Sequence, residues 1–204
     1  METKIIQLFS KVVSVENFEF DKEKIVSEVY KIKFRKPPAD NQSECLQILE
    51  EKIFNDLKKP LMDRFYYFAH NVLKYKKNQE FAITTSWITK TVPGGNSRVH
   101  HHRNCMFSGV LYLKTNPKKA KISFWNPHQQ GFYLIPSEYN IYNSDNYCFA
   151  LNEKNLLFFP SEMQHKIETN ETDSDRLSLA FNIIPINKFG EADSSVNIAL
   201  INDL

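Results

Sequence analysis

The spacing of apolar positions is helical in the first 80 residues and strand-like in the rest of the chain. Residues 4–20 alternate weakly between apolar and polar side chains and predict one or two strands. Residues 21–30 predict a short helix, and the double proline in 37–41 predicts a loop. Two further helices are predicted from Ser43 to Leu57 and from Pro60 to Leu73, because serine can cap a helix and proline is tolerated in a first turn.

From Phe81 onward, short runs of β-branched and aromatic residues alternate with turn residues, which predicts strands. The predicted strands cover 81–89, 105–113, 121–125, 132–135, 147–150, 155–159, 166–168 and 177–183. Short strands at this spacing favour a sandwich or barrel of the jelly-roll type over βαβ units. We therefore predict one mainly β domain with N-terminal helices (α+β) over residues 1–204. Its expected parts are a strand and helices in 1–80, a jelly-roll core with the site in 81–185, and a tail in 186–204.

Composition and charge narrow the class of protein. The 204 residues are 42% hydrophobic and 25% charged, and the net charge of +2 is too small to favour nucleic acid or a membrane as partner. No apolar run approaches the roughly 20 residues that span a bilayer, and the N-terminus lacks the apolar block of a signal peptide. Three cysteines without CxxC spacing fit a reducing compartment. We expect a cytoplasmic protein, and assembly as a homodimer stays open.

The histidines suggest metal chemistry. Three of the six stand in a row as His100, His101 and His102, directly before a predicted strand. In extended chain, residues i and i+2 point to the same side, so His100 and His102 point together while His101 points away. Two neutral imidazoles on one side can form half of a metal site. We expect His70 to be a helix residue at the core edge and His128 to be a solvated loop residue.

The other half of the site is expected far downstream. His165 follows a predicted buried strand and the turn at 159–161, and a jelly roll can bring such distant strand ends to one mouth. Two neighbouring ligands and one distant ligand are the arrangement of a facial triad, which leaves three positions of an octahedral iron open. Arg176 and Ser178 share one face of the following strand, where a guanidinium beside a hydroxyl can clamp the far end of a dicarboxylate.

These motifs resemble those of a known family. His-x-His followed by Asn and Ser-Gly-Val-x-Tyr at 100–112 is similar to the 2-oxoglutarate/Fe(II) oxygenases of bacteria and phages. So are Phe-Pro-Ser-x-x-x-His at 159–165 and Arg-x-Ser-x-x-Phe-Asn at 176–182. The resemblance covers residues 81–185 and implies a cupin-like double-stranded β-helix with the N-terminal helices packed outside.

The resemblance also implies roles for individual residues. It implies His100, His102 and His165 as iron ligands, and Arg176 with Ser178 as the binding site of the distal carboxylate of 2-oxoglutarate. Two pocket candidates, Asn104 and Tyr112, are added from their position alone.

The second ligand position departs from the pattern of the wider superfamily. Most members carry His-x-Asp or His-x-Glu, whereas this chain has His102. An imidazole in place of a carboxylate still supplies a ligand but leaves the iron one unit more positive, so we expect altered activation of 2-oxoglutarate and oxygen. Other oxygenases have iron sites made of three histidines.

The sequence thus predicts an Fe(II)- and 2-oxoglutarate-dependent dioxygenase. Its small-molecule partners would be 2-oxoglutarate, which is decarboxylated to succinate, and dioxygen, while the substrate that is hydroxylated is not identified. Two alternatives stay open. A cupin-like three-histidine metalloenzyme that does not use 2-oxoglutarate would keep its activity after Arg176→Ala, and a non-catalytic jelly-roll binding module would retain no stoichiometric metal.

Overall fold

The computed structural model shows a mainly β protein with few helices, as predicted. The structure describes residues 3–35, 41–116, 119, 121–127, 131–132 and 134–200. Its strands are β1 (Ser14–Asn17), β2 (Glu80–Thr91), β3 (Phe107–Lys114), β4 (Lys121–Trp125), β5 (Asn146–Ala150), β6 (Asn155–Pro160), β7 (His165–Ile167), β8 (Arg176–Phe189) and β9 (Val196–Ile198). Its helical elements are α1 (Lys22–Val29), η1 (Ile48–Glu50), α2 (Asn55–Tyr67), η2 (Phe68–Val72) and η3 (Ala192–Ser194).

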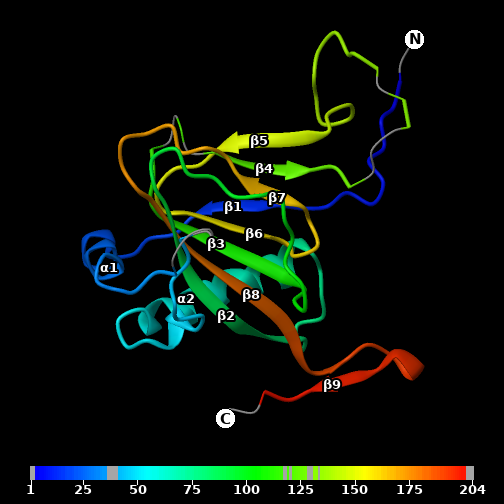
Figure 1. Ribbon diagram of the computed structural model, residues 1–204. Coiled ribbons are helices and arrows are strands. Elements are labelled where there is room, and N and C mark those ends of the chain that lie inside the picture. Colours follow the sequence, from blue (N-terminus) through cyan, green and yellow to red (C-terminus); the bar gives the residue numbers. More distant parts are fainter. Residues whose placement is uncertain are drawn as a thin grey trace.

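The strands form two antiparallel sheets in separate layers (Figure 1). The larger sheet has the strand order β1-β6-β3-β8-β2, and β9 pairs with the distal part of β8. The smaller sheet has the order β5-β4-β7. Helices α1 and α2 pack on one face of the larger sheet, and the smaller sheet packs over the other face. In the described part of the chain, no helix is both long and apolar enough to cross a bilayer.

Two separate cores result because successive strand residues face opposite sides of the sheet. On β8, Leu177 and Leu179 belong to the core under the helices, whereas Ala180 belongs to the core between the sheets. On β3, Leu111 and Tyr112 divide in the same way. Each fully buried leucine contributes about 1.5–3 kcal/mol because its side chain leaves water. A shift of the strand by one residue would move these leucines to the other face of the sheet, so their burial fixes which side chains face the smaller sheet.

Strand β3 approaches β8 closely at Gly109, which lies opposite Phe181 in the ladder. A Cβ atom at this glycine would lie 2.2 Å from Cζ of the Phe181 ring. The ring therefore lies directly against the glycine backbone, and only a residue without a side chain fits at position 109.

The first helix and most of the strands lie where the sequence places them. Asp21 caps α1 by accepting a hydrogen bond from the Lys24 amide at 3.1 Å. The strand predicted at 132–135 is wrong, since Phe132, Leu134 and Ile135 are exposed and in no strand, without a neighbouring strand to pair with. His128 and positions 37–40 of the predicted loop lie outside the described residues.

The helix predicted from Ser43 to Leu57 is also wrong. Ser43 does not cap a helix: its hydroxyl accepts a hydrogen bond from the Ile88 amide at 3.0 Å and donates to the Cys45 carbonyl at 2.7 Å. Isolated bridges from Gln42 and Gln47 to β2 hold residues 42–47 along the strand, and η1 and the start of α2 follow in the rest of the predicted range. Hydrogen bonds to a distant strand thus replace the local bonds of the predicted helix.

The following helix begins earlier than predicted. Helix α2 starts at Asn55, so Pro60 lies inside it rather than in its first turn. Leu57, Leu61 and Phe65 form its buried face, and burying Leu57 with the other two favours the earlier start. At the other end of the chain, β8 continues across the predicted boundary at 185, and the domain division stays a prediction.

Candidate metal centre and cosubstrate pocket

Backbone pairing places the candidate ligands side by side. His165 is the first residue of β7, and it forms an antiparallel bridge with His100, with amide-to-carbonyl distances of 2.8 and 2.9 Å. Two residues further, the His102 amide donates to the Ser161 carbonyl in the turn after β6, at 3.0 Å. The triplet thus lies as an extended segment beside the β6–β7 turn, and only His100 of it forms a ladder bridge.

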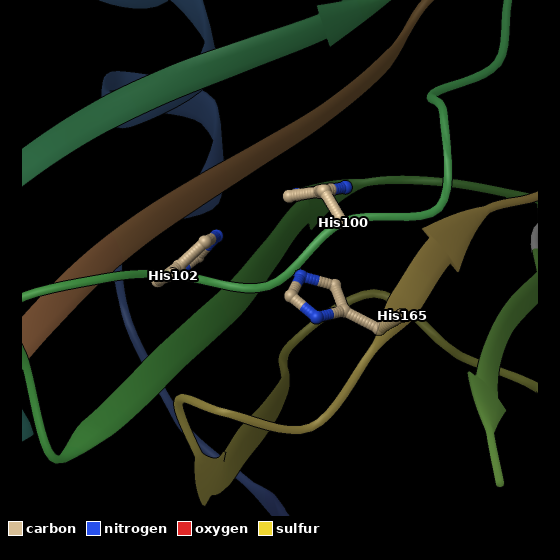
Figure 2. Close-up of side chains that lie close together, drawn as sticks. All are labelled: His100, His102 and His165. Atoms are coloured by element: carbon tan, nitrogen blue, oxygen red, sulfur yellow. The ribbon is translucent and has the colours of Figure 1, made fainter. Parts of the chain in front are cut away.

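The three imidazoles converge on one point (Figure 2). Their ring centroids lie 4.3 Å (His100–His165), 5.0 Å (His102–His165) and 5.4 Å (His100–His102) apart. One ring nitrogen of each lies within 4.8 Å of the others. His101 is exposed, as the i, i+2 rule predicts. The predicted convergence of the adjacent pair and the distant histidine is therefore confirmed.

The second ring nitrogen of each histidine has an acceptor. Nδ1 of His100 lies 2.8 Å from the Arg98 carbonyl, and Nδ1 of His165 lies 2.9 Å from the Met163 carbonyl. A carbonyl oxygen only accepts, so these Nδ1 atoms carry the proton and the Nε2 lone pairs are free. Nδ1 of His102 lies 2.8 Å from both Ser108 Oγ and Asn182 Oδ1. Ligands held in this way are oriented before a metal arrives.

The surroundings keep two of the rings neutral. Burial, reinforced by the neighbouring His100, lowers the pKa of His165 from 6.5 to about 3. Burial and His100 likewise lower the pKa of His102 to about 4, against the opposing effect of its hydrogen bond with Asn182. Neutral imidazole is the form that binds metal, so these two side chains are ready to bind at neutral pH.

A cavity of about 210 Å³ opens beside the three histidines. Side chains of the inner faces of both sheets form its walls, including Trp87, Tyr112 and Ser178, and Asn41 and Asn96 lie among its other lining residues. None of the described residues that line this cavity is a carboxylate. The donor set fits a first-row metal such as iron, which the three imidazole nitrogens would hold beside the cavity.

Arg176 lies buried next to this cavity, although it is not among the residues that line it. Its side chain is 3% exposed, and it pairs in the β2–β8 ladder with Thr91, a cavity-lining residue. Nη1 donates to the Lys121 carbonyl at 3.2 Å, and the guanidinium carbon lies 5.4 Å from the centre of the Tyr112 ring. Nε and Nη2 have no hydrogen-bond partner among the described residues. These two nitrogens are the pair that binds a carboxylate in a fork, so the guanidinium fits the end of a dicarboxylate.

The comparisons with known proteins agree with this chemistry. Residues 85–182 match the sequence model of the family described as "Putative 2OG-Fe(II) oxygenase". This segment contains all three histidines, Arg176 and Ser178. Over this segment the chain is similar to 2OG-Fe(II) oxygenases. The resemblance seen in the sequence motifs is thereby confirmed, whereas no curated protein matches the chain by sequence.

Several solved structures share the fold. An oxidoreductase of the 2OG-Fe(II) oxygenase family from Burkholderia pseudomallei is 15% identical, with a TM-score of 0.58 over 80% of this chain and 77% of that chain. HygX from Streptomyces hygroscopicus, with nickel, 2-oxoglutarate and hygromycin B bound, is 14% identical, with a TM-score of 0.58 over 85% and 82%. The α-ketoglutarate-dependent epimerase SnoN from nogalamycin biosynthesis is 12% identical, with a TM-score of 0.62 over 86% and 77%. At these identities the likeness establishes the fold alone.

The other candidate site residues fall in different places. Tyr112 is 1% exposed and lines the cavity, and burial raises the pKa of its hydroxyl. Asn104 is not brought to the cavity: it lies exposed in a turn with φ of 58°. His70 lies in η2 with its ring stacked on Tyr66 at 5.4 Å, in keeping with a helix residue at the core edge.

Sequence reasoning missed the residues that surround His102 Nδ1. Ser108, Ser161 and Asn182 form a hydrogen-bonded group at this nitrogen, with Ser108 Oγ 2.8 Å from Ser161 Oγ and 3.2 Å from Asn182 Oδ1. A signal was available, because all three belong to the motifs that carry the resemblance. Asn182 also follows Ser178 by four residues, which puts both on the same face of β8.

Proposed function

We propose that the protein is an Fe(II)- and 2-oxoglutarate-dependent dioxygenase whose iron ligands are His100, His102 and His165. Arg176, with Ser178 beside it, binds the distal carboxylate of 2-oxoglutarate. The observation that carries the proposal is the combination of three converging imidazoles with a buried guanidinium that has two free nitrogens. The two unpaired guanidinium nitrogens of Arg176 favour this function over a three-histidine metalloenzyme that does not use 2-oxoglutarate, because such an enzyme needs no carboxylate clamp.

Bound iron supplies the site at which dioxygen is activated by the oxidation of 2-oxoglutarate. The chain's own residues orient and enclose the reactants. The three imidazoles would hold the metal beside the cavity, where the reactants can reach it. Arg176 fixes the far end of the dicarboxylate, while Trp87 and Val110 keep the cavity wall apolar and limit the entry of water.

The cavity lies between the two sheets, which supports an assignment of the fold. We assign the two facing sheets to a double-stranded β-helix with the site between them, in line with the shared fold of HygX and SnoN.

The volume of the cavity, about 210 Å³, is below the ~300–1,000 Å³ of ordinary ligand pockets. With 2-oxoglutarate bound, only a small group of the substrate to be hydroxylated enters, and the rest lies at the mouth. A cytoplasmic location suits the three free cysteines and an Fe(II) cofactor.

The proposal is tested by adding Fe(II) and 2-oxoglutarate to the purified protein without oxygen. We expect the weak visible metal-to-ligand charge-transfer band of iron-bound 2-oxoglutarate in the wild type. His165→Ala should abolish the band, because it removes one of three ligands. His101→Ala is the matched control: it removes an exposed imidazole next to the site and should leave the band unchanged. A wild-type protein that binds iron and shows no band contradicts the proposal.

A further inference from the structure

The three candidate ligands differ in what holds their second nitrogen. His100 and His165 face the main-chain carbonyls of Arg98 and Met163, at 2.8 and 2.9 Å. These acceptors are present whatever the side chains are, so the Nδ1–H form of both rings is fixed by the backbone. His102 faces only side chains at its Nδ1, namely Ser108 and Asn182, each at 2.8 Å. Its protonation pattern therefore depends on the residues at those two positions.

Of these two neighbours, Ser108 cannot determine which ring nitrogen of His102 carries the proton. A hydroxyl both donates and accepts, so Ser108 could equally donate to a bare Nδ1 of His102. In that arrangement the proton of the imidazole would lie on Nε2, the atom that faces the other two histidines, and this nitrogen could not bind a metal. Ser108 Oγ lies 3.2 Å from Asn182 Oδ1 as well as 2.8 Å from Ser161 Oγ, so its proton has other acceptors.

Asn182 does determine which ring nitrogen of His102 carries the proton. Its Oδ1 is an amide oxygen, which only accepts, and it lies at hydrogen-bond distance from His102 Nδ1. Its amide nitrogen is engaged on the other side, donating to Thr85 Oγ1 on β2 at 3.0 Å. Asn182 and Thr85 are also neighbours in the ladder between β8 and β2, so two central strands hold the Asn182 side chain beside His102.

We propose that Asn182 is a positioning residue that fixes His102 in the Nδ1–H form and so makes its Nε2 a metal ligand. The inference rests on the proposed function, since it concerns the same metal centre. It also gives a reason why an imidazole works at position 102, where the wider superfamily has a carboxylate. The side chain behind this position presents a hydrogen-bond acceptor, which suits the N–H of a ligating histidine.

Two substitutions at position 182 separate this role from a merely structural one. Asn182→Leu keeps a similar volume but removes the acceptor, and the Ser108 hydroxyl can then donate to Nδ1. We expect metal affinity to fall about 10–100-fold, as for other residues that orient a ligand. Asn182→Asp restores an acceptor that cannot donate, and its negative charge favours the cation, so we expect affinity equal to or tighter than that of the wild type.

Two further variants serve as comparisons. Ser108→Ala removes the other neighbour of the same nitrogen and leaves the obligate acceptor in place, so we expect a much smaller loss than for Asn182→Leu. Asn197→Leu makes the same substitution on the exposed strand β9 and should change nothing at the metal centre.

The experiment measures two quantities for each variant. Ni(II) affinity is obtained by competition with a chelator, and the position of the His102 proton is obtained from ¹⁵N shifts of the imidazole in the metal-free protein at pH 7.5. We expect the Nδ1–H form in the wild type and in Asn182→Asp, and a mixture containing the Nε2–H form in Asn182→Leu. Thermal unfolding of the metal-free variants confirms that they are folded.

The outcomes distinguish this inference from the proposed function. If Asn182→Leu keeps wild-type Ni(II) affinity and a pure Nδ1–H form, Asn182 does not set the proton position and the inference is overturned. Loss of affinity in Asn182→Asp as large as in Asn182→Leu also overturns it, because the acceptor would then be irrelevant. If the wild type itself binds no metal, the proposed function fails, whereas the ¹⁵N shifts of the metal-free protein still decide the proton position.

Discussion

Replacing Arg176 by methionine should have opposite effects on the empty and on the liganded protein. In the empty protein, Nε and Nη2 are buried without a partner among the described residues, at a cost of about 1–3 kcal/mol each. The bond from Nη1 to the Lys121 carbonyl and the contact with the Tyr112 ring return about 1–2 kcal/mol together. The Lys121 carbonyl keeps a second donor, the Glu168 amide at 3.1 Å, so the substitution leaves no orphaned acceptor.

Methionine at position 176 is therefore expected to leave the empty protein as stable as the wild type, or more stable by up to about 5 kcal/mol. Binding of 2-oxoglutarate should weaken, because two charge-assisted hydrogen bonds to its distal carboxylate are lost. At about 1.5–3 kcal/mol for each hydrogen bond to a charged group, the loss of two bonds corresponds to about a hundredfold to about 10⁴-fold in Kd.

The assay combines chemical denaturation of the metal-free protein with calorimetric titration of 2-oxoglutarate into the Ni(II)-loaded protein, which avoids turnover. Arg64→Met is the matched control, since Arg64 lies on α2 and is partly exposed, with its Nη1 3.7 Å from Glu16. Two results would refute the reasoning. One is unchanged 2-oxoglutarate affinity in Arg176→Met, which would place the clamp elsewhere. The other is a destabilisation above about 3 kcal/mol in the empty protein, which would mean that the guanidinium is well paired.

Two further predictions concern packing and pH. Gly109→Ala places a methyl group against the Phe181 ring and should cost about 1–3 kcal/mol, or about 3–10 °C in Tm; an unchanged Tm contradicts the close contact. Because the pKa values of His102 and His165 are lowered to about 4 and 3 in the folded state, the unfolded chain binds more protons below pH 6.5. The metal-free protein should therefore lose stability as the pH falls from about 6.5 to 3, by about 2.5 kcal/mol for each ring at pH 4.5. Denaturation at pH 7 and 4.5 tests this expectation, and a His165→Asn variant with the same pH dependence as the wild type would contradict it.

The local sequence was sufficient to predict those helices and strands whose conformation is determined by their own residues. Helix α1 was predictable because Asp21 caps it and apolar positions recur at helical spacing, with Ile25 and Val29 buried. The strand Asn155–Pro160 was predictable because an apolar run ends at a proline. In each case the residues that determine the conformation are only a few positions apart.

Local signals failed where a distant partner competes for the backbone. The segment that begins at Ser43 carries helical spacing, yet bridges at Gln42, just before it, and at Gln47 pair it with β2. The apolar residues near Phe132 carry strand-like composition, but those that the structure describes are exposed and belong to no strand. Strand β9 gave no signal at all, because its formation depends on pairing with the extension of β8. A strand is stabilised by its neighbours, and its own sequence does not specify them.

The same division holds at the metal centre. The sequence by itself determined the donors, namely His100 and His102 on one side of an extended segment, a third histidine downstream, and an arginine with a serine two residues later. Only the tertiary structure decided that His165 pairs with His100, that Arg176 is buried with two free nitrogens, and that Asn182 stands behind His102. The physical reason is range: side-chain direction follows from the geometry of neighbouring residues, whereas convergence, burial and hydrogen-bond partners depend on backbone pairing between strands far apart in the chain.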